Sequence, residues 1–168
     1  GLVNSSELVP MLTAISTTEV TPFVRVPTLE AGIIAKSLDY GSYGIICPMI
    51  NTRKDAERFV SYCNYPPLGT RSFGPLRASF YAGGNYSKNA NETVLTFAMI
   101  ETKQSLDNLD EIICVEGLDA VFVGPSDLGF SLGFEPGNYN EPFLIDSIEI
   151  ILKKAHKQGI RAGIYSYE

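Results

Sequence analysis

Three charged residues in this sequence stand at or just beyond the ends of apolar runs that suit buried β-strands. Arg25 and Glu101 each end such a run, and Asp127 follows another after a Gly-Pro-Ser turn. In parallel barrels, the working groups lie at the carboxyl ends of the strands. A charge in such a place is costly to desolvate unless it is paired or bound to a metal. We therefore expect these three side chains to share one face of a sheet.

The two carboxylates, Glu101 and Asp127, are hard oxygen ligands of the kind that Mg²⁺ and Mn²⁺ prefer. Positions left open on the metal would suit water and a 2-keto acid, which chelates through one carboxylate oxygen and its keto oxygen. Such a metal stabilises the enolate that forms when a carbon–carbon bond is broken or made, and Arg25 could stabilise the same charge. The turn at 124–129 adds the backbone N–H groups of Ser126 and Asp127 as a site for a carboxylate.

A purely structural interpretation of the same residues stays open on spacing alone. Glu101 would then cap its strand or the next helix, Asp127 would cap a turn, and Arg25 would pair with one of them. Arg71 and Arg77 could reach an acidic substrate over the mouth of the site, although solvated loop arginines are the simpler interpretation.

Five short apolar runs rich in β-branched residues predict buried strands at 23–26, 44–47, 94–100, 120–123 and 162–165. Helical patterns lie between them, at 29–38, 53–63, 106–114 and 145–157. A further helix is expected first, because Asn4 and Glu7 have the spacing of a capping box. His156, the single histidine, falls near the end of the last helix and is a poor candidate for a general base. Strands alternating with helices indicate the α/β class with a parallel sheet.

A closed barrel is slightly favoured over an open doubly wound sheet, because no glycine-rich phosphate turn follows an early strand. A complete (β/α)8 barrel has eight strands and typically ~250 residues. This sequence has five predicted strands, opens on a helix and stops after a strand. We therefore predict that residues 1–168 form one partial (β/α)8 TIM barrel, truncated at both ends. The long stretch 64–91 is predicted to be irregular and functional.

The composition excludes several classes of partner. The chain has 168 residues, 45% of them hydrophobic, and a net charge of -6, which argues against nucleic-acid binding. Its apolar runs are too short to span a membrane and its start does not resemble a signal peptide. Cys47, Cys63 and Cys114 show no paired spacing, which indicates free thiols. We expect a cytoplasmic protein.

Five segments, in order and in spacing, resemble the HpcH/HpaI aldolase family across almost the whole chain: 23–27 (FVRVP), 44–49 (GIICPM), 65–71 (YPPLGTR), 100–102 (IET) and 123–128 (VGPSDL). The resemblance implies a (β/α)8 barrel from its second helix to its seventh strand. It also implies a metal-dependent class II aldolase that splits a 4-hydroxy-2-oxo acid into pyruvate and an aldehyde, and a homo-oligomer when full length.

Particular residues match the positions that carry the chemistry of that family. Glu101 and Asp127 match its metal ligands, for Mg²⁺, Mn²⁺ or Co²⁺. Arg25 matches its catalytic, substrate-binding arginine. The amides of Ser126 and Asp127, in the turn that begins at Gly124, match the groups that hold the pyruvate carboxylate.

Three departures from the family pattern are visible. The family's general-base histidine is expected immediately before Gly1, so it is not among these residues. Met99 stands where the family usually has a glutamine. A further helix, the eighth strand and a last helix are expected after Glu168 and are likewise not among these residues. We therefore expect little or no aldolase activity from residues 1–168 alone.

Two alternatives remain at this stage. One is a citrate-lyase-like enzyme that cleaves CoA thioesters, although the segments at 65–71 and 124–129 favour the aldolase branch. The other is a non-catalytic or degenerate homologue that binds metal or keto acid weakly. An acidic residue followed by histidine, encoded upstream of Gly1, would favour the enzyme.

Overall fold

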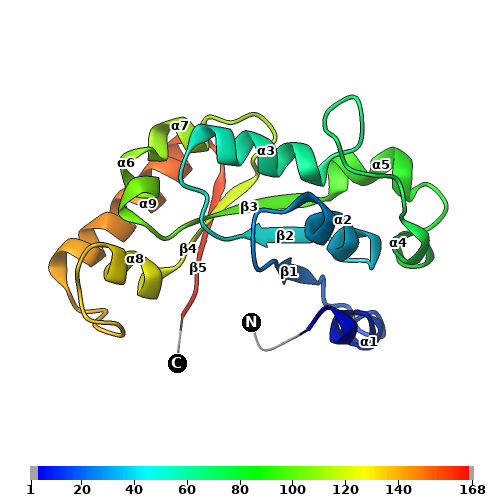
Figure 1. Ribbon diagram of the computed structural model, residues 1–168, viewed down its shortest axis with the longest axis horizontal. Coiled ribbons are helices and arrows are strands. Elements are labelled where there is room, and N and C mark those ends of the chain that lie inside the picture. Colours follow the sequence, from blue (N-terminus) through cyan, green and yellow to red (C-terminus); the bar gives the residue numbers. More distant parts are fainter. Residues whose placement is uncertain (1–3, 167–168) are drawn as a thin grey trace.

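A single parallel sheet organises the computed structural model, which describes residues 4–166. Its strands are β1 (Phe23–Arg25), β2 (Gly44–Cys47), β3 (Leu95–Ile100), β4 (Ala120–Val123) and β5 (Arg161–Ile164). They pair in the order β1-β2-β3-β4-β5, which is also their order in the chain (Figure 1). A doubly wound sheet reverses its strand order part-way. The unreversed order is that of a (β/α)8 barrel, so the predicted fold class is confirmed for these strands.

The helices in the described range are α1 (Ser5–Ile15), α2 (Ala31–Asp39), α3 (Arg53–Cys63), α4 (Leu76–Ala82), α5 (Tyr86–Thr93), α6 (Lys103–Asp107), α7 (Leu109–Ile113), α8 (Pro125–Ser131) and α9 (Pro142–Gln158). Figure 1 shows α4 and α5 at one end of the molecule and α6 and α8 at the other. Within residues 4–166, no helix is long and apolar enough to cross a membrane.

Most predicted elements are confirmed, and two are wrong. The capping box of α1 is present, with the Asn4 N–H donating to Glu7 Oε2 at 2.7 Å. The predicted helix at 106–114 is instead the pair α6 and α7, because Asn108 between them leaves the helical conformation. The predicted irregular stretch 64–91 contains α4 and most of α5.

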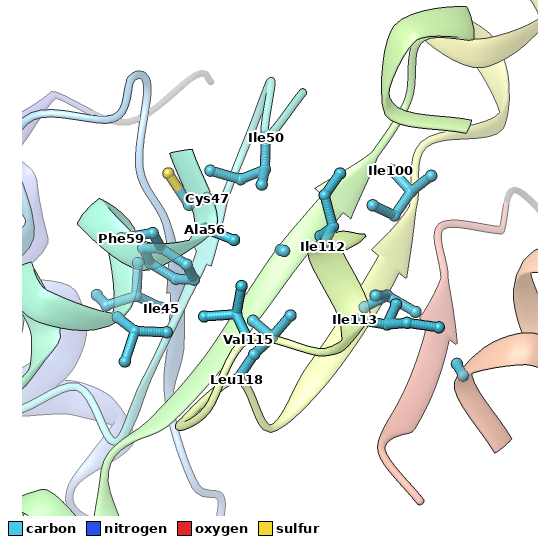
Figure 2. Packing of buried hydrophobic residues seen from close by; sticks show 14 of the residues in the cluster. Ile45, Cys47, Ile50, Ala56, Phe59, Ile100, Ile112, Ile113, Val115 and Leu118 are labelled. Atoms are coloured by element: carbon cyan, nitrogen blue, oxygen red, sulfur yellow. The ribbon is translucent and has the colours of Figure 1, made fainter. Parts of the chain in front are cut away.

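The hydrophobic core lies on one face of the sheet, where alternate strand residues meet the helices (Figure 2). Ile45, Ile100 and Val121 from the strands are fully buried there, as are Phe59 of α3 and Ile151 of α9. Burying one such side chain stabilises the fold by about 1.5–3 kcal/mol. This packing fixes where each strand ends, and therefore where the residues after it lie.

The other face of the sheet carries the remaining alternate residues. Arg25 is in register with Ile46, and Ile46 with Phe97. Met99 is in register with Phe122. Because side chains alternate along a strand, Glu101, which directly follows β3, falls on this same face as Arg25.

The described cysteines are free thiols, as predicted. Cys47 and Cys63 are buried and Cys114 is exposed. Burial raises the pKa of Cys47 to about 12. Cys47 therefore stays protonated at neutral pH, and we assign it to packing.

Candidate metal and substrate site

Glu101 is a buried carboxylate at the carboxyl end of β3. Its side chain is almost fully enclosed, with 2% of the residue exposed. The backbone N–H of Met49 donates to Oε1 at 2.7 Å. Oε2 is buried and has no hydrogen-bond partner among the described residues. A buried polar atom without a partner is rare in native proteins and calls for an explanation, such as an ion.

The electrostatic surroundings of Glu101 disfavour its charged form. Desolvation raises the pKa of Glu101 above its ordinary value, and the nearby negative charge of Asp127 raises it further. The N–H of Met49 and the positive charge of Arg25 oppose that rise. A cation beside Oε2 would supply the compensation that the protein itself leaves incomplete.

Asp127 and Arg25 both lie near enough to Glu101 to act on its ionisation. Asp127 is exposed in the first turn of α8, and Arg25 is exposed at the end of β1. Neither carboxylate forms an ion pair with Arg25 within 4.0 Å in the part of the chain that the structure describes. Asp127 also makes no side-chain bond that caps α8. Among the described residues, the structure therefore shows neither the ion pair with Arg25 nor a capping bond from Asp127.

Gly124 closes the site from the side of β4. A Cβ at this position would lie 2.8 Å from Glu101 Oε2 and 3.2 Å from the methyl carbon of Met99. A side chain here would therefore fill the space next to the unpartnered oxygen.

The backbone amides that follow Gly124 begin α8. Ser126 and Asp127 stand in its first turn, where N–H groups have no partner within the helix, and no side chain caps them. The Ser126 hydroxyl is hydrogen-bonded to the Tyr139 hydroxyl at 2.9 Å, so it is already engaged. The amides, rather than the hydroxyl, remain the groups suited to an anionic substrate.

These residues fit a divalent cation that is coordinated partly by the protein and partly by substrate or water. Among residues 4–166, no group of three or more His, Cys, Asp or Glu side chains could hold a metal by itself. Mg²⁺ is usually bound through one or two carboxylates, with the other positions taken by water or substrate. Glu101 and Asp127 supply that number, and Glu101 supplies it with an unpartnered oxygen.

Arg71 and Arg77 lie away from this site. Arg71 is buried and pairs with Asp39 at 2.7 Å, at the end of α2, and it donates to the Tyr86 hydroxyl at 3.1 Å. Because α2 leads into the start of β2, the Arg71–Asp39 pair lies at the amino ends of the strands, whereas the site lies at their carboxyl ends (Figure 1). Arg77 contacts Thr13 of α1 at 2.6 Å. Two predictions for Arg71 are therefore wrong: it is neither a solvated loop arginine nor a residue that reaches over the mouth of the site.

Two features of the site were missed from the sequence. Met49 contributes only its backbone, in a left-handed conformation with φ of 56° that nothing in its residue type suggests. Tyr139 reaches Ser126 from a loop whose residues give no chemical signal. His156 lies in the last turn of α9, as predicted.

Comparison with known proteins places this geometry in a family. Residues 3–165 match the family described as HpcH/HpaI aldolase/citrate lyase. The chain belongs to this family. It is 43% identical over 164 residues to the hydroxypyruvate/pyruvate aldolase of Rhizorhabdus wittichii strain RW1, covering 97% of this chain and 65% of the relative. It is 37% identical over 161 residues to the 5-keto-4-deoxy-D-glucarate aldolase of Escherichia coli O139:H28, covering 95% and 62%.

A solved structure has the same fold. A HpcH/HpaI aldolase/citrate lyase family protein from Burkholderia cenocepacia J2315 superposes with a TM-score of 0.89 at 29% identity, covering 97% of this chain and 66% of that one. The chain spans somewhat less than two thirds of the length of the two aldolase relatives.

Proposed function

We propose that the protein containing this chain catalyses the metal-dependent aldol cleavage of a 4-hydroxy-2-oxo acid to pyruvate and an aldehyde. The observation that carries the proposal is Glu101, a buried carboxylate whose Oε2 has no partner and which senses the charges of both Asp127 and Arg25. Membership of the family and the aldolase names of the two relatives support this reaction class.

Each residue has a distinct role in this proposal. Glu101 and Asp127 would hold Mg²⁺, Mn²⁺ or Co²⁺, which when bound supplies Lewis-acid stabilisation of the negative charge that develops on the keto oxygen. Arg25, whose positive charge acts on Glu101, would stabilise the same developing charge. The amides of Ser126 and Asp127 bind the substrate carboxylate and orient it.

Burial makes this arrangement effective. Glu101 is excluded from water, so charges near it interact more strongly than they would in solvent. The side chains of Met99 and Ile46 keep the adjoining face of the sheet apolar. The general base, the homo-oligomer and the cytoplasmic location stay predictions.

The test is to titrate Mg²⁺ or Mn²⁺ into the purified protein and to follow pyruvate release from a panel of 4-hydroxy-2-oxo acids. We expect release that requires metal and is lost in the Glu101→Gln, Asp127→Asn double variant. A matched control makes the same two changes at exposed residues, Glu116→Gln and Asp146→Asn, and should release pyruvate at the parent rate.

Other outcomes would replace the proposal. Cleavage of a CoA thioester without pyruvate release would favour a citrate-lyase-like enzyme. Binding of a keto acid without turnover of any substrate would favour a non-catalytic homologue.

A further inference from the structure

The turn after β2 holds a methionine in an unusual backbone conformation. Met49 has φ of 56°, and it is the one non-glycine residue with a positive φ among residues 4–166. The left-handed region is sterically costly for a residue with a Cβ, and such residues cluster at functional sites. The Met49 side chain is 54% exposed, so side-chain packing does not account for the conformation.

The hydrogen bond to Glu101 does account for it. The chain is fixed on both sides of Met49, by β2 before it and by the buried Ile50 after it. With the Met49 N–H pointing at Glu101, the positive φ at Met49 is the rotation that carries the following chain back to the buried position of Ile50. That N–H reaches Glu101 Oε1 at 2.7 Å, across 52 positions of sequence, and joins the ends of β2 and β3.

The two oxygens of Glu101 are consequently unequal. Oε1 is held by the Met49 N–H, whereas Oε2 is buried without a partner and faces the space left open by the missing side chain of Gly124. A carboxylate held in this way can turn neither oxygen freely. Loss of a group that hydrogen-bonds to a metal ligand and orients it typically weakens metal binding or activity by about 10–100-fold.

We propose that Met49 is a positioning residue: its left-handed backbone lets its N–H point at Glu101 Oε1 while the chain turns on to Ile50, so that Glu101 presents Oε2 alone to the cation. Glu101 then binds the metal through one oxygen rather than two. This inference rests on the proposed metal site and adds to it the means by which the ligand is oriented. The alternative is an ordinary tight turn whose hydrogen bond has no effect on metal binding.

The experiment measures Mn²⁺ binding to the purified protein without substrate, from the electron paramagnetic resonance signal of free Mn²⁺. Met49→Ile keeps an apolar side chain but adds a β-branch that opposes a positive φ, and we expect it to weaken Mn²⁺ binding about tenfold. Met49→Gly keeps the N–H and removes the steric cost of the positive φ. It should bind Mn²⁺ at least about fivefold more tightly than Met49→Ile does. Met11→Ile, at an exposed methionine of α1, is the matched control and should bind as the parent does.

The outcomes separate this inference from the proposed function. Equal Mn²⁺ affinity in the parent, Met49→Ile and Met49→Gly would overturn the positioning role and leave the metal site standing. Failure of the parent to bind Mn²⁺ would overturn the metal site and the positioning role together.

A second variant decides the matter if circular dichroism shows that Met49→Ile is unfolded. Gly124→Ala places a Cβ 2.8 Å from Glu101 Oε2, in a backbone conformation with φ of -99° that alanine adopts readily. We expect it to weaken Mn²⁺ binding by about tenfold or more, because it obstructs the one oxygen that is offered to the cation. Parental affinity in folded Gly124→Ala would contradict the assignment of Oε2.

Discussion

Replacing Glu101 by glutamine should stabilise the metal-free protein and abolish its stabilisation by metal. The carboxylate is buried, accepts one hydrogen bond from Met49, and leaves Oε2 without a partner. Glutamine keeps an oxygen for the Met49 N–H and removes the buried charge, but it leaves a neutral NH₂ group unpartnered. An unpartnered charged group costs more than an unpartnered neutral one, and the difference is about 1–2 kcal/mol.

The effect has a defined pH dependence. Because desolvation raises the pKa of Glu101 in the folded protein above its ordinary value, the unfolded chain ionises first as pH rises. The free energy of unfolding therefore falls between the ordinary pKa and the raised one, and stays lowered above it. Glu101→Gln should match the parent below that window and exceed it at about pH 8, with a midpoint of thermal unfolding about 3–6 °C higher.

Metal should reverse this order. A cation at one hundred times its Kd stabilises the parent by about 2.7 kcal/mol, whereas the variant lacks the ligand and gains nothing. The assay is thermal unfolding by circular dichroism, at both pH values, with and without Mg²⁺ or Mn²⁺. Glu116→Gln, an exposed position, controls for the substitution and should change the free energy of unfolding by less than about 0.5 kcal/mol.

One result would refute this reasoning. If Glu101→Gln were destabilised equally at both pH values and the parent gained nothing from metal, Glu101 would be a neutral structural group rather than a poised ligand.

Two further predictions concern the other end of the sheet, at the amino ends of the strands. Arg71→Met should lower the free energy of unfolding, measured by urea titration, by about 3 kcal/mol, because it leaves the Asp39 carboxylate without its buried guanidinium partner. Arg53→Met removes an exposed pair with Glu57 and should lower it by less than about 1 kcal/mol. Equal losses in the two variants would contradict the argument. Gly69→Ala would place a Cβ well under 3.0 Å from the main-chain oxygens of Ser61 and Asn64, at the end of α3. It should lower the free energy of unfolding by about 1–3 kcal/mol, and an unchanged urea midpoint would show that this loop can move aside.

The strands were predictable because their residues carry the signal themselves. Runs of apolar and β-branched residues predicted β2 and β4 with their exact bounds and the other three strands to within one residue at each end. Helices α4 and α5 were not predictable, because each is short and depends on tertiary contacts such as those of Ala78 and Tyr86. The break at Asn108 was hidden because apolar residues continue on both sides of it.

The site divides in the same way. Arg25, Glu101 and Asp127 were predicted as site residues because a charge at the end of an apolar run has few explanations. In the structure, Asp127 and Arg25 lie near enough to Glu101 to affect its pKa. The Met49 N–H could not be identified, since a backbone donor has no residue type and a positive φ runs against the preference of methionine.

The central claim is that Glu101 and Asp127 hold a divalent cation to which a 2-keto acid binds. The most direct test is the ¹³C relaxation of labelled pyruvate in the presence of Mn²⁺ and the purified protein. We expect the carboxylate and keto carbons to relax faster than they do with Mn²⁺ alone, and their relaxation to be enhanced more than that of the methyl carbon. The enhancement should be lost in the Glu101→Gln, Asp127→Asn variant. The account would be contradicted if the pyruvate carbons relaxed no faster with the protein than with Mn²⁺ alone, or if the enhancement persisted in the variant.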